Sequence, residues 1–272
     1  MRSAIIGLLT LTLSAELDAQ EQQPPPSAWN ATLGAAAVVV PRYLGSDEYR
    51  VLPFPLAQVT YDSRVYLGPS AGGGAGGAIG VYAIRTPRLG VAVEVGIQDS
   101  RPESRANALA GMADRDVVAT AGASLTYRTG MVEWSAGATR GLNDGAGFLG
   151  TGRVSISQRF ARLIAGVGVG ATIADAKQMR RDFGVTQLEA SRRQALIDAG
   201  DGRLQAEDGI TYRPDGGLRH VGASLSLTYL LSQRWSLVGF GGVDRLSDEA
   251  SESPLVRRRE QFSGGIGLGY RL

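Results

Sequence analysis

Apolar and polar residues alternate with a period of two along most of the chain from Trp29 onward. In the segment 117–127 the odd-numbered positions are almost all apolar, whereas the even-numbered positions are mostly Gly, Ser or Thr. Because successive side chains of a β-strand point to opposite faces, this pattern predicts strands with one apolar face and one small, polar face. The same pattern recurs in the segments 89–97, 163–173, 221–229 and 262–272.

The length of the alternating runs separates two classes of all-β protein. Strands of a soluble sandwich need only about 5 residues. The runs in this chain extend over about 9–11 residues, which is the length that a tilted strand needs to cross a membrane. We therefore expect an all-β fold over residues 29–272, namely a transmembrane antiparallel up-and-down β-barrel.

The connections between the predicted strands alternate between short and long. In outer-membrane barrels the short turns and both termini face the periplasm, whereas the long loops are external, and the observed alternation fits this arrangement. Near the N-terminus the segments 30–40, 51–61, 64–72 and 77–85 add four strands, which gives twelve in total; ten is the alternative if the first hairpin lies outside the wall. The short connections are 86–88, 129–130, 161–162 and 232–234, and the longer ones are 99–114, 141–147, 176–216 and 247–260.

The first residues have the features of an export signal. Arg2 is followed by the apolar run 4–13, and the small residue Ala19 suits a cleavage site. That run is too short for a membrane-spanning helix, which needs about 20 apolar residues. We expect a cleaved signal peptide over 1–19, a Pro- and Gln-rich periplasmic lead over 20–28, and delivery to the Gram-negative outer membrane.

Composition excludes several kinds of chemistry. The chain has no Cys and one His, so disulfides, thiolate nucleophiles and metal sites built from several His or Cys residues are excluded. The formal charge of +2 is too small to indicate a nucleic-acid partner. We expect no cofactor and no metal.

His220 is the candidate for catalysis that deserves weighing, because Ser224 and Ser226 follow it on the same predicted strand. A catalytic triad also requires an orienting carboxylate and an oxyanion site, and spacing along the sequence supplies neither. We expect a rim or lumen histidine with a structural role and a protein that is not an enzyme.

The predicted charged positions fall into two groups. Inward-facing Glu94, Glu133, Arg128 and Arg271 need partners or water inside the lumen. The predicted external loops carry arginine clusters, and guanidinium groups are suited to bind the phosphates of lipopolysaccharide. The alternative is that these arginines are exposed to solvent and are balanced by nearby acidic residues of the loops. These candidate lipopolysaccharide contacts are Arg180, Arg181, Arg192, Arg193, Arg257, Arg258 and Arg259.

Several segments together resemble the MipA/OmpV family, the MltA-interacting proteins of Gram-negative outer membranes. The most specific is 245–256, in which a strand end is followed by Ser-Asp-Glu and then Ser-Pro. Within it we assign a candidate interaction loop of Arg245, Ser247, Asp248, Glu249, Ser253 and Pro254. The other segments are 41–50, 52–55 with Tyr61, 113–116, 183–185, 190–192 and 235–237.

This resemblance implies a β-barrel without catalytic residues that acts as a scaffold. Its partners would be a lytic transglycosylase and a bifunctional murein synthase. Two alternatives stay open: a channel for small solutes, and a surface adhesin or lipopolysaccharide-binding barrel. The most distinctive segments are predicted to be external, whereas a murein scaffold needs periplasmic contacts.

Overall fold

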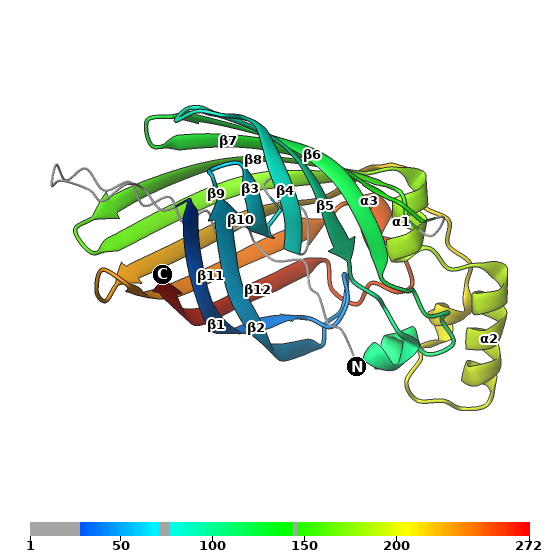
Figure 1. Cartoon of the computed structure of the whole chain (residues 1–272). Coiled ribbons are helices and arrows are strands. Elements are labelled where there is room, and N and C mark those ends of the chain that lie inside the picture. The colour runs from blue at the N-terminus through cyan, green and yellow to red at the C-terminus, as the bar shows by residue number, and fades with distance from the viewer. Residues whose placement is uncertain (1–27, 71–76, 144–145) are drawn as a thin grey trace, which may run out of the picture.

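The computed structural model describes residues 28–70, 77–143 and 146–272, and they form a closed β-barrel (Figure 1). Each strand pairs antiparallel with its neighbours along the chain, and β1 pairs with β12 to close the wall. The prediction of twelve strands is therefore confirmed. The predicted signal peptide 1–19 and all of the lead 20–28 except Ala28 lie outside the described residues.

The strands have the lengths expected for a membrane wall, apart from β3. The first six are β1 (Trp29–Pro41), β2 (Tyr49–Tyr61), β3 (Val65–Pro69), β4 (Gly77–Arg85), β5 (Leu89–Gln98) and β6 (Val118–Thr129). The last six are β7 (Val132–Gly141), β8 (Phe148–Phe160), β9 (Leu163–Ala174), β10 (Gly217–Leu230), β11 (Trp235–Leu246) and β12 (Glu260–Arg271).

The register at the closing seam is regular. Thr32 of β1 lies opposite Arg271 of β12, and the pairing runs without a break to Val39 opposite Gly264. Both chain ends of the barrel therefore lie at the same end, as predicted. We call it the turn end, because the short connections lie there, and we call the opposite end the loop end.

The outward face of the wall is apolar, as the alternation predicts. Val95, Val169 and Ile266 are each more than half exposed in the isolated protein. At the turn end, Trp29 stacks near Tyr61 with ring centroids 4.6 Å apart, and a second pair, Trp235 and Tyr270, lies 4.9 Å apart. Aromatic rings at the border of an apolar band are typical of the membrane interface of outer-membrane barrels.

One part of the lumen differs from the prediction of a uniformly small, polar inner face. Val38 and Val40 of β1 are buried against Phe240 of β11 inside the barrel. The glycines of β12 make this packing possible, since a Cβ on Gly265 would lie 2.7 Å from the ring of Phe240. Apolar side chains therefore fill the lumen beside the seam; Ala36, Leu52, Phe54 and Leu56 belong to the same cluster.

The remaining lumen holds the polar contacts. Glu94 is buried and accepts hydrogen bonds from Tyr66 and Ser70. Arg128 pairs with Glu133, which confirms that inward-facing charges find partners. Arg271, in contrast, is exposed at the turn end.

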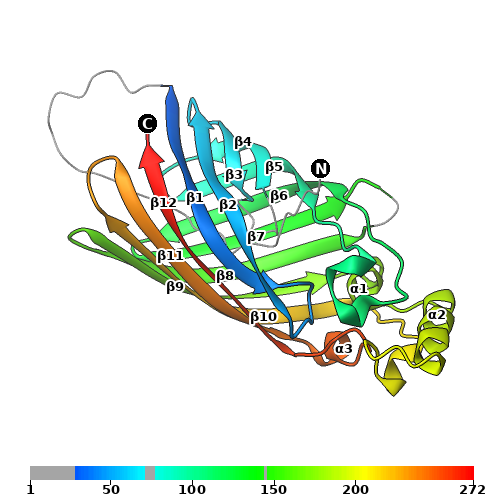
Figure 2. The ribbon, with the colours of Figure 1, turned by 90° about the horizontal axis from the view of Figure 1, so that it is seen from below.

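The helices gather at the loop end (Figures 1 and 2). The connection between β9 and β10 contains α1 (Ala176–Phe183), α2 (Gln187–Asp198) and the 3-10 turn η3 (Ala206–Gly209). None of the described helices is long and apolar enough to cross a membrane. The other connections contain η1 (Glu103–Arg105), η2 (Asn107–Leu109) and α3 (Asp248–Ser251).

Candidate functional site

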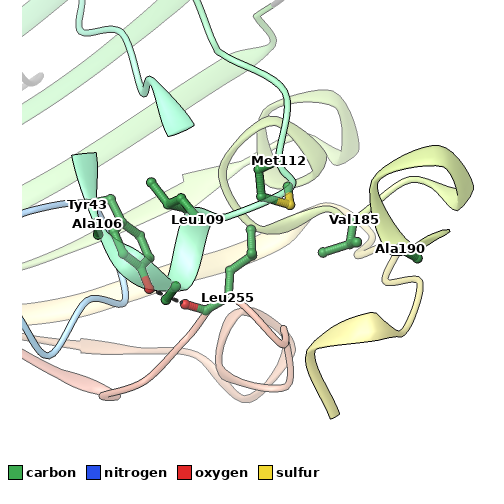
Figure 3. Close-up of a cluster of buried hydrophobic side chains, with 8 residues drawn as sticks. Tyr43, Ala106, Leu109, Met112, Val185, Ala190 and Leu255 are labelled. Carbon is green, nitrogen blue, oxygen red and sulfur yellow. Dashed lines mark hydrogen bonds between the residues drawn. The ribbon is translucent and has the colours of Figure 1, made fainter. Parts of the chain in front are cut away.

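The long connections at the loop end pack together as a small folded cap. Its core takes Tyr43 from the β1–β2 connection, Leu109 from η2, Val185 from the segment between α1 and α2, and Leu255 from the β11–β12 connection (Figure 3). The Tyr43 hydroxyl donates a hydrogen bond of 2.7 Å to the carbonyl oxygen of Leu255. Four separate hairpins thus contribute to one core; its other members are Ala106, Ala108, Met112, Ala190 and the flanking Tyr212.

A buried ion pair fixes the far side of the cap. The side chains of Arg193 on α2 and Asp208 on η3 are completely buried, with 3.4 Å between Nη2 and Oδ1. Arg193 also donates hydrogen bonds to the carbonyl oxygens of Ala108 and Ala110. Arg257 binds both carboxylate oxygens of Asp208, and these hydrogen bonds raise the pKa of Arg257.

The start of α2 is joined to the β5–β6 connection. Thr186 and Glu189 form a capping box, in which each side chain bonds to the other's backbone N–H. Glu189 also accepts hydrogen bonds from the Ala113 N–H and the Arg115 guanidinium, both at 3.1 Å. Burial raises the pKa of Glu189, but the hydrogen bonds from Thr186 and Ala113 and the charge of Arg115 outweigh it, so the pKa is lowered.

The predicted lipopolysaccharide contacts separate into two sets. Arg193 is buried, Arg181 donates to the carbonyl oxygen of Asp116, and Arg257 is bonded to Asp208, so these three hold the cap together. Contact with lipopolysaccharide phosphates stays a prediction, and the accessible members of the set are Arg180, Arg192, Arg258 and Arg259.

The candidate interaction loop is also built into the cap. Ser247 caps α3 by accepting from the Ala250 N–H, and Ser253 donates 2.6 Å to the carbonyl oxygen of Phe183. The first serine of the motif therefore begins α3, and the second serine, which precedes the proline, joins the segment after α3 to the end of α1. Three side chains of the loop are exposed: those of Arg245, Asp248 and Glu249. Arg245 pairs with Glu260, Asp248 pairs with Arg259, and Glu249 accepts a hydrogen bond from the Asp215 N–H. Pro254 is buried.

A cavity of about 290 Å³ lies in the barrel directly below the cap. It is bounded by the loop-end residues of several strands and by α1. Its charged lining is strongly unequal in sign. The cationic side chains are Arg42, Arg50, Arg101, Arg105, Arg115, Arg153, Arg181 and Arg219, and the acidic ones are Asp99, Asp182 and Asp244.

His220 lines this cavity from β10. Its Nδ1 atom has no hydrogen-bond partner among the described residues. Ser224 also lines the cavity, but its hydroxyl lies 3.5 Å from both Arg153 Nη1 and the Gly168 carbonyl oxygen. The described contacts therefore do not join His220 and Ser224 as a nucleophile and base, and the absence of enzymatic activity stays a prediction.

The turn end carries a second concentration of charge, which we call the arginine ring. The two-residue turn at Asp62 and Ser63, both with positive φ, fixes Arg64 at the edge of β3, and Arg85 donates 3.0 Å to the Ser63 carbonyl oxygen. In the short turns, all of which are described, Asp62 is the one acidic residue. The exposed members of the ring are Arg64, Arg85, Arg88, Arg159, Arg162, Arg234 and Arg271.

A family model described as MltA-interacting protein MipA matches residues 33–272. The chain belongs to the MipA family. This match covers the barrel from residue 33, within β1, to the end of β12, together with the cap. No curated protein matches the chain.

Solved barrels resemble this MipA-family chain only distantly. The NanC porin is 6% identical with a TM-score of 0.45, and the match covers 88% of this chain and all of the porin. An outer membrane channel from Pseudomonas putida F1 is 11% identical with a TM-score of 0.40, and the match covers 94% of this chain and all of the channel.

Most residues that line the cavity or form the arginine ring were not singled out from the sequence; the exceptions are Arg181, His220 and Ser224 in the cavity and Arg271 in the ring. Arg101 and Arg219 stand alone between unrelated neighbours, so no local motif marks them. The ring had a usable signal, because Arg88, Arg162 and Arg234 each lie in a predicted short turn. The MipA family match supplies no residue-level roles for either set.

Proposed function

We propose that this outer-membrane barrel is a non-enzymatic scaffold that docks murein-processing enzymes, a lytic transglycosylase and a bifunctional murein synthase, at its periplasmic face. The arginine ring carries this proposal. A murein scaffold needs a periplasmic contact surface, and the distinctive loops, which are predicted to be external, do not provide one. The arginine ring would provide this surface. A family named for interaction with MltA is consistent with such a role.

The ring suits docking for physical reasons. Four of its arginines lie in short turns between paired strands, and the other three lie at or near the ends of strands, so the positions of their backbones are fixed before a partner arrives. Exposed charge of one sign speeds the encounter with a partner surface of opposite charge. Added salt screens this attraction and slows the association. We therefore expect the docking face of the enzyme to be acidic.

The test uses purified lytic transglycosylase and the full-length barrel in detergent micelles. The variant Arg88→Glu/Arg162→Glu reverses two charges of the ring, and the matched control Arg192→Glu/Arg258→Glu reverses two exposed charges of the cap. We expect binding by the parent and the control, and at least a tenfold loss for the ring variant. Absence of binding by the parent, or equal binding by both variants, would overturn the proposal.

Capture from crosslinked outer membranes extends this test to the murein synthase. Recovery of both enzymes with the parent and the cap variant, and of neither with the ring variant, is the expected result. The channel and surface-adhesin alternatives stay predictions. Solute flux into liposomes that carry the protein tests the channel. Loss of surface binding after trimming of residues 178–212 tests the surface adhesin.

A further inference from the structure

The cavity below the cap combines a confined volume with an excess of positive charge. Its charged lining contains far more arginines than acids, and Asp99 is shared by Arg50 and Arg105. Asp182 is paired with Arg219 at 3.4 Å. Because charges removed from bulk water require compensation, this excess favours an anion within the cavity.

Several nitrogens of the lining are buried and have no hydrogen-bond partner within the described part of the chain. They are Nε of Arg50, Arg115 and Arg219, Nη2 of Arg101, and Nδ1 of His220. Buried polar groups in proteins are nearly always bonded, so the four unsatisfied guanidinium donors around one cavity indicate a place where an acceptor binds. Oxygen atoms of an anion would supply both the acceptors and the missing negative charge.

The same side chains are held in place by their other nitrogens. Arg101 donates 2.6 Å to the Asp182 carbonyl oxygen, and Arg115 donates 3.1 Å to Glu189. Burial and the nearby charge of Arg115 outweigh the opposite effects of Asp182 and Glu189 and lower the pKa of Arg101 to about 10. Guanidinium groups anchored along one edge are suited to bind oxyanions through the other.

We propose that this cavity is a binding site for a small oxyanion, a phosphate or carboxylate group, held by Arg50, Arg101, Arg115 and Arg219. The site is distinct from the arginine ring and does not depend on the scaffold function. Its volume of about 290 Å³ limits the ligand to an inorganic ion or a small solute.

Calorimetric titration of the full-length barrel in detergent micelles with inorganic phosphate tests the site, with acetate as a second arm. We expect saturable phosphate binding that Arg101→Gln and Arg219→Gln each weaken at least tenfold and that Arg192→Gln, on the exposed face of α2, leaves unchanged. Binding of phosphate alone identifies a phosphate site, and binding of acetate as well identifies a general oxyanion site. No saturable binding, or equal binding by all variants, overturns the proposal.

A second measurement avoids the effect of substitutions on folding. Phenylglyoxal modifies accessible arginines. In the parent protein, mass spectrometry of the peptides measures the rate of modification at each arginine. We expect phosphate to slow modification at Arg50, Arg101 and Arg219 and to leave Arg192 unaffected. Equal rates with and without phosphate at the cavity arginines would contradict the site.

Discussion

The hydroxyl of Tyr43 donates a hydrogen bond of 2.7 Å to the carbonyl oxygen of Leu255, which lies on the other side of the closing seam. Both residues are buried in the cap core. Tyr43 follows β1 and Leu255 precedes β12, so this bond joins the first and last connections at the loop end. The cap and the seam therefore stabilise each other.

Replacing Tyr43 with Phe removes this bond and retains the ring. The Leu255 carbonyl then stays buried without its donor, so we expect a loss of about 1 kcal/mol in local stability. Hydrogen exchange in the segment 250–258 should become faster. Tyr229→Phe, on the outward face of β10, is the control, and equal exchange in both variants would contradict the assigned role.

Asp208→Asn removes the charge that compensates buried Arg193. Leaving one member of a buried pair uncompensated costs about 3–5 kcal/mol, so the cap should open while the barrel remains folded. Limited proteolysis should then cleave between α2 and β10, and migration of the unheated protein on gels should still report a folded barrel.

The control for this variant is Asp215→Asn, which affects the pair of Arg180 and a largely exposed Asp215. Exposed pairs contribute less than about 1 kcal/mol, so cleavage should hardly change. If both variants were cleaved at the same rate, the buried pair would not be what holds η3 against α2.

The lowered pKa of Glu189 predicts that the cap depends on pH. The ordinary pKa of the group is 4.5, and the folded value lies below it. The carboxylate therefore stabilises the cap above about pH 4.5, and this contribution is lost as the pH falls through the folded pKa. Proteolysis of the cap should increase on acidification in the parent. Glu189→Gln should show faster proteolysis at neutral pH and a smaller change with acid.

Gly265→Ala tests the apolar packing inside the lumen. Its Cβ would lie 2.7 Å from the ring of Phe240 and 2.8 Å from the Ala37 carbonyl oxygen, so we expect a loss of about 1–3 kcal/mol. The temperature at which the barrel unfolds on gels should fall. Gly239→Ala, where a Cβ meets no atom within 4 Å, should leave it unchanged.

The wall of the barrel could be predicted because its signal is local. Alternation in segments such as 163–173 reports which face of a strand meets lipid, and the structure confirms the segments that correspond to β3 and β4 as separate strands. The filled lumen was missed because Val38 and Val40 belong to an apolar run that hides the alternation.

The cap could not be predicted in the same way. Arg193 and Arg192 are adjacent and chemically identical, yet Arg193 is completely buried and Arg192 is exposed. That difference depends on where η2 and η3 lie, which in turn depends on four connections meeting above a closed wall. The cavity is a product of the same long-range arrangement, so its arginines carry no signature in the sequence.

The pairing of Thr32 with Arg271 has a consequence for the kinetics of assembly. It joins strands separated by nearly the whole barrel sequence, so its formation carries the largest loop-closure entropy of any contact in the wall. Until β12 arrives, β1 presents an open edge that another chain can pair with. A chain truncated before β12 should therefore accumulate as an aggregation-prone intermediate. It can form neither the β1–β12 seam that closes the barrel nor the Tyr43–Leu255 bond above that seam.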